Sequence, residues 1–250
     1  MNPAINKHNT GGCFLIQPIG ENPIFTREQF SDEHREIKQM VREFAGERIL
    51  ENKKEIEKFN KDLSLSLIRE VGELGLLGID IPEEYGGMEL DKITTAIVAE
   101  SFMAGECASF MVTWSVQTGI GSLPIVWFGT PEQKKKYLPK LVTGEWIGAY
   151  GLTEPSAGSD ALSGKTRATL SEDGKHYILN GEKIFITNGG WANVYIVFAQ
   201  VDGDKFSAFI VDRDTPGFAI GAEEKKMGMK GSSTTSLTFT DAKVPAENLL

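Results

Sequence analysis

Residues 143–151, Thr-Gly-Glu-Trp-Ile-Gly-Ala-Tyr-Gly, mark the point at which the pattern of apolar residues changes along the chain. Before this stretch, apolar residues recur every three or four positions, the spacing that buries one face of a helix. After it, short runs of β-branched and aromatic residues are separated by turn dipeptides, which is typical of strands. The 250-residue chain is therefore predicted to be an α+β protein, with an all-α domain over residues 26–146 and a small β domain over residues 147–250.

Helix-start signals recur through the first half. Thr26 with Gln29 forms a capping-box pattern, and Ser31 begins a longer helix. Further helices are predicted near residues 63–77, ending before Gly78, and from Asp91 to Met103. One more begins at the stretch Thr130-Pro-Glu-Gln133, which joins a capping threonine, a proline at the first helical position and a glutamine three residues on. The predicted buried face of the helix after Ser31 consists of Ile37, Met40, Val41 and Phe44.

Turn dipeptides divide the second half into strands. Asp173-Gly174, Asn180-Gly181 and Asp202-Gly203 each fit a tight hairpin turn. Strands are predicted on both sides of the last turn, over residues 194–200 and 205–211. Because no helical pattern is left to connect parallel neighbours, we expect a small antiparallel sandwich or barrel.

Charge and cysteine usage exclude several kinds of partner. With 35 acidic and 26 basic residues, the formal charge is -9, which repels the phosphate backbone of nucleic acid. Cys13 and Cys107 have no neighbouring thiol and the three histidines are scattered, so neither a redox pair nor a metal site is predicted. Unpaired cysteines fit a reducing compartment, and residues 1–25 carry no secretory or transit pattern. We expect a cytoplasmic protein with a native tail over residues 1–25.

Two separated segments carry residues suited to a flat polar ligand. The first, Tyr150-Gly-Leu-Thr-Glu-Pro-Ser-Ala-Gly-Ser-Asp160, is rich in turn formers and small hydroxyl residues, so it offers N–H and O–H donors. The second, Ile184-Phe-Ile-Thr-Asn-Gly-Gly190, places an aromatic ring and a hydroxyl at a predicted strand end, where one can stack and the other can hydrogen-bond. Alone, the first segment is more typical of a structural turn, but the pair favours a binding site.

These segments resemble the acyl-CoA dehydrogenase family. The Thr-Glu-Pro-x-x-Gly-Ser-Asp pattern of residues 153–160, the Ile-Thr-Asn of residues 186–188 and the closing Val244-Pro-Ala-Glu-Asn-Leu-Leu250 occur in this order in its members. The resemblance covers about residues 25–250, and residues 224–230 are most similar to the very-long-chain branch. The helical half carries two further matching stretches, residues 81–87 and 128–133.

The resemblance implies an FAD-binding site in the β domain. Thr153 and Thr187 would hydrogen-bond the edge of the isoalloxazine ring, and Ser159 would lie where the flavin meets the CoA part of the substrate. The family usually has tryptophan where this chain has Phe185, so stacking should survive while the indole N–H is lost. Glu154 is expected to support the turn and not to act as the catalytic base. The implied cofactor-binding residues are Tyr150, Gly151, Leu152, Thr153, Gly158, Ser159, Phe185, Ile186 and Thr187.

The resemblance also implies a reaction, the α,β-dehydrogenation of a fatty acyl-CoA to a trans-2-enoyl-CoA in fatty acid β-oxidation. The expected electron acceptor is an electron-transferring flavoprotein, and the full-length protein is expected to be a homo-oligomer. The family carries its catalytic glutamate in a C-terminal helical bundle, so we expect no catalytic residue in this chain, which ends at Leu250 and should be inactive alone.

Two alternatives to this reading remain open. An acyl-CoA oxidase or a flavin monooxygenase would share the architecture but would let oxygen react with the flavin. A non-catalytic acyl-CoA- or flavin-binding module would use the same pocket without turnover.

Overall fold

The computed structural model describes residues 25–203 and 205–250, so the tail predicted over residues 1–25 lies, apart from Phe25, outside the described residues. The chain divides into two compact units, Met1–Glu36 and Ile37–Leu250. In the first unit, the backbone N–H of Thr26 donates to Gln29 Oε1 at 2.9 Å at the start of the 3-10 turn η2 (Arg27–Gln29). Ser31 Oγ accepts from the backbone N–H of His34 at 3.1 Å, so both predicted helix starts are confirmed.

The helices follow the predicted capping residues closely. Asp91 Oδ1 accepts from the backbone N–H of Thr94 at 2.8 Å, and Thr130 and Gln133 form a reciprocal capping box. The helix predicted to reach Leu77 is shorter, because Gly75 adopts a left-handed φ of 77° that ends it early. The helices are α1 (Asp32–Phe44), the π-helical turn η3 (Ala45–Leu50), α2 (Glu51–Glu57), α3 (Lys61–Glu73), α4 (Lys92–Phe102), α5 (Ala108–Thr118), α6 (Leu123–Phe128) and α7 (Pro131–Val142).

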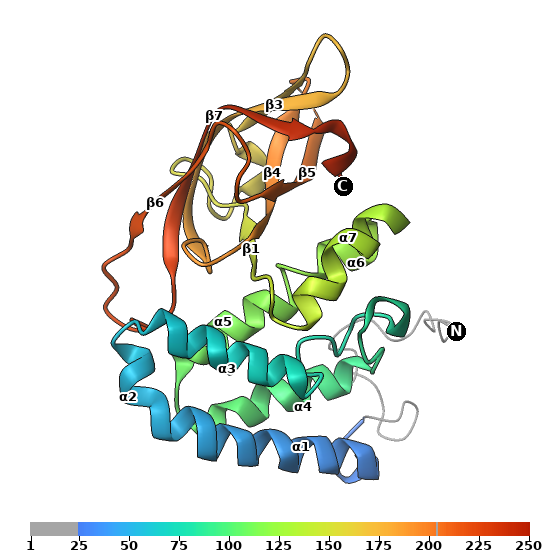
Figure 1. The fold of residues 1–250 in the computed structure, drawn as a ribbon, viewed down its shortest axis with the longest axis vertical. Coiled ribbons are helices and arrows are strands. Elements are labelled where there is room, and N and C mark those ends of the chain that lie inside the picture. Colours follow the sequence, from blue (N-terminus) through green and yellow to red (C-terminus); the bar gives the residue numbers. More distant parts are fainter. Residues whose placement is uncertain (1–24, 204) are drawn as a thin grey trace, which may run out of the picture. The chain divides into compact units, whose positions relative to one another are not determined.

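The second half is a curled sheet, drawn from yellow to red in Figure 1. Its strand order is β1-β4-β2-β3-β7-β6, with β5 paired to β4. The helical half and this mostly antiparallel sheet confirm the predicted α+β class. The strands are β1 (Gly148–Gly151), β2 (Arg167–Leu170), β3 (His176–Thr187), β4 (Val194–Val201), β5 (Lys205–Asp212), β6 (Phe218–Glu223) and β7 (Thr234–Pro245).

Two strand pairings differ from the fully antiparallel arrangement that was expected. β4 runs parallel to β1 and to β2, while the remaining pairings between described strands are antiparallel. A parallel pair needs a long connection, which is usually a helix. Here the β2–β3 hairpin lies between β1 and β4 in the chain, so strands provide the connection in place of a helix.

Two of the three predicted hairpin turns are confirmed and one is wrong. Asp173-Gly174 connects β2 to β3, and Asp202-Gly203 connects β4 to β5. Asn180-Gly181 lies inside β3, where the register with β7 shifts between Leu179 and Gly181. The glycine has a φ of 151°, and an added Cβ would lie 2.5 Å from Thr166 Oγ1, so a close backbone approach requires glycine here.

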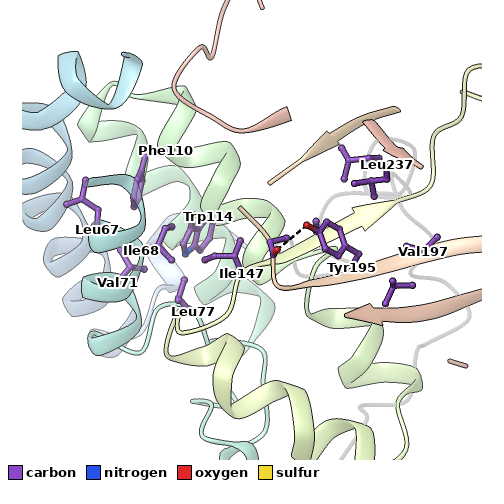
Figure 2. Close-up of a cluster of buried hydrophobic side chains, with 14 of the residues drawn as sticks. Leu67, Ile68, Val71, Leu77, Phe110, Trp114, Ile147, Tyr195, Val197 and Leu237 are labelled. Atoms are coloured by element: carbon purple, nitrogen blue, oxygen red, sulfur yellow. Dashed lines mark hydrogen bonds between the residues drawn. The ribbon is translucent and has the colours of Figure 1, made fainter. Parts of the chain in front are cut away.

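One hydrophobic core extends from the helices into the sheet (Figure 2). It joins Leu67 and Trp114 of the helical half to Ile147, Tyr195 and Leu237 of the β half. As predicted for α1, Val41 is completely buried and its apolar neighbours on the same face pack against this cluster. The boundary drawn after residue 146 stays a prediction.

Buried polar side chains also join the two halves. The Asn188 amide donates to Thr113 O in α5 at 3.1 Å and to Gly148 O in β1 at 3.2 Å. Gln117, near the end of α5, accepts from the backbone N–H of Gly148 at 2.7 Å and donates to Trp146 O at 2.9 Å. These bonds fix the end of α5 against the start of the sheet, next to the two segments suggested for ligand binding.

Candidate functional site

The two segments suggested by the sequence meet at one pocket of about 260 Å³. The end of α5 forms one side of the pocket, the segment after β1 a second, and the end of β3 a third. The lining residues are Val116, Ile120, Tyr150, Leu152, Thr153, Phe185, Ile186 and Thr187. Residues more than thirty positions apart in the chain therefore share one small concave surface.

A bulge in β3 gives Phe185 its position. The register between β3 and β7 shifts between Lys183 and Ile186, and Phe185 adopts a φ of 60°. The bulge breaks the usual alternation, so Ile186 is buried while the Phe185 side chain is 62% exposed. An exposed aromatic ring at the edge of a pocket provides a flat apolar face for a ligand.

Two threonines give the pocket its polar character. The backbone carbonyl of Thr153 accepts from Ile184 N at 2.9 Å, and Thr187 pairs with Thr234 of β7, so both backbones are held. Within residues 25–203 and 205–250, neither threonine hydroxyl takes part in an intramolecular hydrogen bond. The hydroxyls are therefore available to a ligand, as donors or as acceptors.

Glu154 lies behind the pocket in a tight turn. Its backbone N–H and carbonyl exchange hydrogen bonds with Ala157 at 3.0 and 3.1 Å. Its carboxylate lies 2.6 Å from Lys183 Nζ and also accepts from the backbone N–H groups of Lys165 and Thr166. Burial alone would raise the pKa of Glu154, but these hydrogen bonds outweigh it and hold the pKa below its usual value. A carboxylate with every partner in place supports structure, which agrees with the role expected for Glu154.

Three of the residues suggested by the sequence do not line the pocket. Gly151 is buried at the end of β1, whereas Gly158 and Ser159 are exposed beyond the turn. Conversely, Val116 and Ile120 line the pocket and were not anticipated. α5 is apolar on most of its surface, so its sequence contains no periodicity that distinguishes pocket residues from core residues.

A second, apolar groove of about 430 Å³ shares Ile120 and Tyr150 with the pocket. Trp127 and Phe128, at the end of α6, lie along it with 59% and 70% of their surface exposed. Burial raises the pKa of the Tyr150 phenol, which therefore stays neutral at physiological pH. The pocket thus continues into a broad apolar surface formed by α6 and by strands β4 and β5.

Across residues 25–203 and 205–250, no three His, Cys, Asp or Glu side chains are grouped so that they could hold a metal ion. In the same part of the chain, none of the helices combines the length and the apolar character needed to cross a membrane.

The fold, a helical half followed by a curled β half, matches that of flavin-dependent acyl-CoA oxidoreductases of known structure. Two family models match the chain, the N-terminal domain of acyl-CoA dehydrogenase over residues 31–145 and its middle domain over residues 149–242. The chain belongs to the acyl-CoA dehydrogenase family.

Individual relatives agree with this assignment. A probable acyl-CoA dehydrogenase of Bacillus subtilis (strain 168) is 52% identical over 240 residues, 96% of this chain and 40% of that protein. The crystal structure of acyl-CoA dehydrogenase complexed with FAD from Bacillus anthracis has a TM-score of 0.91 at 53% identity, over 96% of this chain and 41% of that one. Butyryl-CoA dehydrogenase from Megasphaera elsdenii has a TM-score of 0.81 at 38% identity, over 91% of this chain and 60% of that one. The chain thus spans about 40% of the length of the first two relatives.

Proposed function

We propose that this chain forms the flavin-facing part of an FAD-dependent acyl-CoA dehydrogenase, which oxidises a fatty acyl-CoA to a trans-2-enoyl-CoA. The observation that carries the proposal is the pocket in which Thr153, Phe185 and Thr187, from two separate segments, share one concave surface. The family membership and the FAD complex of the Bacillus anthracis relative support it.

The lining of the pocket fits the isoalloxazine ring of FAD. The exposed ring of Phe185 can pack on a flat face, and the uncommitted hydroxyls of Thr153 and Thr187 can hydrogen-bond a polar edge. The proposed site contains all nine residues suggested by the sequence. Gly151 would pack behind the ring, Gly158 would belong to the segment along the ring, and Ser159 would lie where the flavin meets the CoA part of the substrate.

When bound, FAD would supply the acceptor for the hydride that leaves the β carbon of the substrate. The residues of this chain would orient the ring and exclude water from one of its faces. A dehydrogenation also needs a base for the α proton, and no residue among those described as lining the pocket is acidic. Because Glu154 is fully engaged with Lys183, we propose that the base comes from a part of the protein outside these 250 residues.

Several finer features belong to the same proposal. We propose that the helical domain covers residues 26–146 and the β domain residues 147–250, and that the enzyme acts in fatty acid β-oxidation. Electron-transferring flavoprotein would accept the electrons, and the complete protein would act as a homo-oligomer in the cytoplasm. The apolar groove beside the pocket, with Trp127 and Phe128 exposed along it, supports an apolar substrate or a covering element of the protein.

The test uses the complete protein that contains this chain. Purified protein should retain FAD and reduce an artificial electron acceptor when acyl-CoA is added, with enoyl-CoA as product, while residues 1–250 alone should bind FAD weakly and turn over negligibly. Thr187→Val, which removes one hydroxyl at nearly constant volume, should weaken FAD binding about tenfold. Thr169→Val, at an exposed position of β2, is the matched control and should bind FAD normally.

Three outcomes would contradict the proposal or its parts. A complete protein that binds no FAD would contradict it entirely. Enoyl-CoA formation by residues 1–250 alone would show that the base lies within this chain. Fast reoxidation of the reduced enzyme by air would favour the acyl-CoA oxidase alternative.

A further inference from the structure

A completely buried lysine lies beside the proposed flavin pocket and has no part in the function described so far. Lys183, in β3, is 0% exposed, although lysine is almost never fully buried unless it is paired. Its Nζ lies 2.6 Å from Glu154 Oε1 and donates to the backbone carbonyl of Leu152 at 3.2 Å. Burial lowers the pKa of Lys183, and the hydrogen bond to Glu154 offsets part of that effect.

Glu154 extends the contact to a third segment. Its side chain is 4% exposed and accepts from the backbone N–H of Thr166 at 3.0 Å and from that of Lys165. The ion pair therefore connects the segment after β1, the segment before β2 and strand β3 at one point. Each charge has its hydrogen-bond partners, as a buried charge requires.

The neighbouring glycines leave little free space around the pair. A Cβ added at Gly164 would lie 2.9 Å from Glu154 Oε1, and one added at Gly151 would lie 3.5 Å from Lys183 Cγ. The lysine stem therefore packs directly on the backbone at the end of β1, and the carboxylate packs on the backbone before β2. This enclosure fixes the pair in one geometry.

One residue bonded to the pair, Leu152, belongs to the pocket wall. Lys183 binds the carbonyl of Leu152, and the next residue, Ile184, donates its backbone N–H to Thr153 O at 2.9 Å. Leu152 and Thr153 line the pocket on one side, and Phe185 lines it on the other. The two walls are therefore held relative to each other by the Lys183 side chain and by the backbone N–H of Ile184.

We propose that Lys183 is a positioning residue for the flavin, which holds the Leu152–Thr153 backbone and the Phe185 bulge at the separation that the isoalloxazine ring needs. The inference rests on the proposed function and goes beyond it, because Lys183 is not itself among the residues that line the pocket. Glu154 is its counter-charge, and the two act as a unit.

The positioning role can be separated from a purely structural one. Removing only one partner leaves a buried charge without compensation, which strongly destabilises a protein, whereas replacing both by neutral residues removes that charge. Glutamine at position 154 keeps an acceptor for the backbone N–H groups of Lys165 and Thr166, while methionine at position 183 still removes the donor from Leu152 O. Stability and flavin binding should therefore respond differently to the double substitution.

The experiment compares three variants of the complete protein that contains this chain: Lys183→Met, Lys183→Met with Glu154→Gln, and Lys136→Met. Lys136 is the matched control, since it also forms an ion pair, with Asp212 at 3.2 Å, but does not line the pocket. FAD affinity is measured by titrating the apoprotein, the visible absorption band of bound flavin is recorded, and stability is measured by urea unfolding.

Lys183→Met should lower both the urea midpoint and the FAD affinity. The double variant should recover part of the urea midpoint, yet bind FAD about tenfold or more weakly and shift its visible band. Lys136→Met should leave FAD affinity and spectrum unchanged. If the double variant does not fold, Lys183→Gln, which keeps a donor, should show a smaller loss of affinity in the same direction.

The outcomes separate this inference from the proposed function. A wild-type protein that binds no FAD would overturn both. Only the positioning role is overturned if the wild type binds FAD and the folded double variant binds it with the same affinity and spectrum. If the double variant does not fold, the same result with Lys183→Gln overturns that role.

Discussion

Phe185 adopts a backbone conformation that aromatic residues rarely take, with a φ of 60°. For a residue with a Cβ, this left-handed region costs about 1–2 kcal/mol. The side chain does not recover that cost by burial, because 62% of it is exposed. Strain at an exposed aromatic residue beside a pocket is consistent with a function that needs the ring.

Replacing Phe185 should therefore affect ligand binding more than folding. Phe185→Gly removes the ring and relieves the unfavourable φ, so the urea midpoint should stay equal or rise while FAD affinity falls about tenfold. Phe185→Trp keeps a flat face at the same position and should retain FAD affinity. Urea unfolding and FAD titration of the two variants test this prediction, and a marked loss of stability in Phe185→Gly would contradict it.

Glu154 should make stability depend on pH in the acid range. Its pKa in the folded chain lies below the usual value, so the unfolded chain binds more protons as the pH falls below about 5. The contribution of the ion pair is present at neutral pH and is lost as the pH falls through the folded pKa. The free energy of unfolding should therefore fall more steeply from about pH 5 to 3 in the wild type than in Glu154→Gln. Urea unfolding at several pH values measures both slopes, and parallel profiles would exclude this role for Glu154.

Among the elements, β3 shows how a turn signal can lie inside a strand. Asn180-Gly181 has the composition of a hairpin turn, yet Asn180 donates its side-chain amide to Asp241 at 3.0 Å and the strand continues. Gly181 allows the backbone of Thr166 to approach, and the register shift at this point bends the strand. The same strand then bulges again at Phe185, so β3 is reshaped twice before it reaches the pocket.

Glycine substitutions in and beside β3 separate close packing from backbone conformation. Gly181→Ala should destabilise the chain by about 2–4 kcal/mol, because the new methyl group would overlap Thr166 and the backbone would be strained. Gly174→Ala, at a φ of 67° with no atom within 4 Å of the added Cβ, should cost only about 1 kcal/mol. Urea unfolding of both variants measures the difference, and equal costs would show that the contact with Thr166 can relax.

At the scale of the whole molecule, the helices and the sheet of residues 37–250 form one structural unit. The hydrophobic core contains Trp114 and Ile147 together with strand residues such as Leu237. Asn188 adds hydrogen bonds from the end of β3 to both α5 and β1. A core shared in this way predicts a single cooperative unfolding transition.

Substitution of Asn188 tests this coupling. Asn188→Gly fits the φ of 65° and leaves two buried carbonyls without their donor, so it should cost about 2–4 kcal/mol. In the wild type, urea unfolding followed by far-UV circular dichroism, which reports the helices, should coincide with unfolding followed by tryptophan fluorescence. Two separate transitions in the wild type would indicate that the helical and β halves unfold independently.

Local signals in the sequence were sufficient for several of the elements. The helix starts at Asp91 and Thr130 were predictable because a cap depends on residues within one turn of each other. The β4–β5 hairpin was predictable for a similar reason, since its turn and both strands are contiguous. The parallel pairs of β4 with β1 and β2 were not, because they depend on how a hairpin folds back across the sheet.

By itself, the sequence determined the α+β class, the boundaries of several elements and two segments suited to a flat ligand, because these depend on neighbouring residues and on the period of apolar positions. Only the tertiary structure decided that Val116 and Ile120 join those segments in one pocket and that Gly158 and Ser159 lie outside its lining. It alone paired Lys183 with Glu154, since a contact between residues 29 positions apart depends on strand register and burial, which no local pattern encodes.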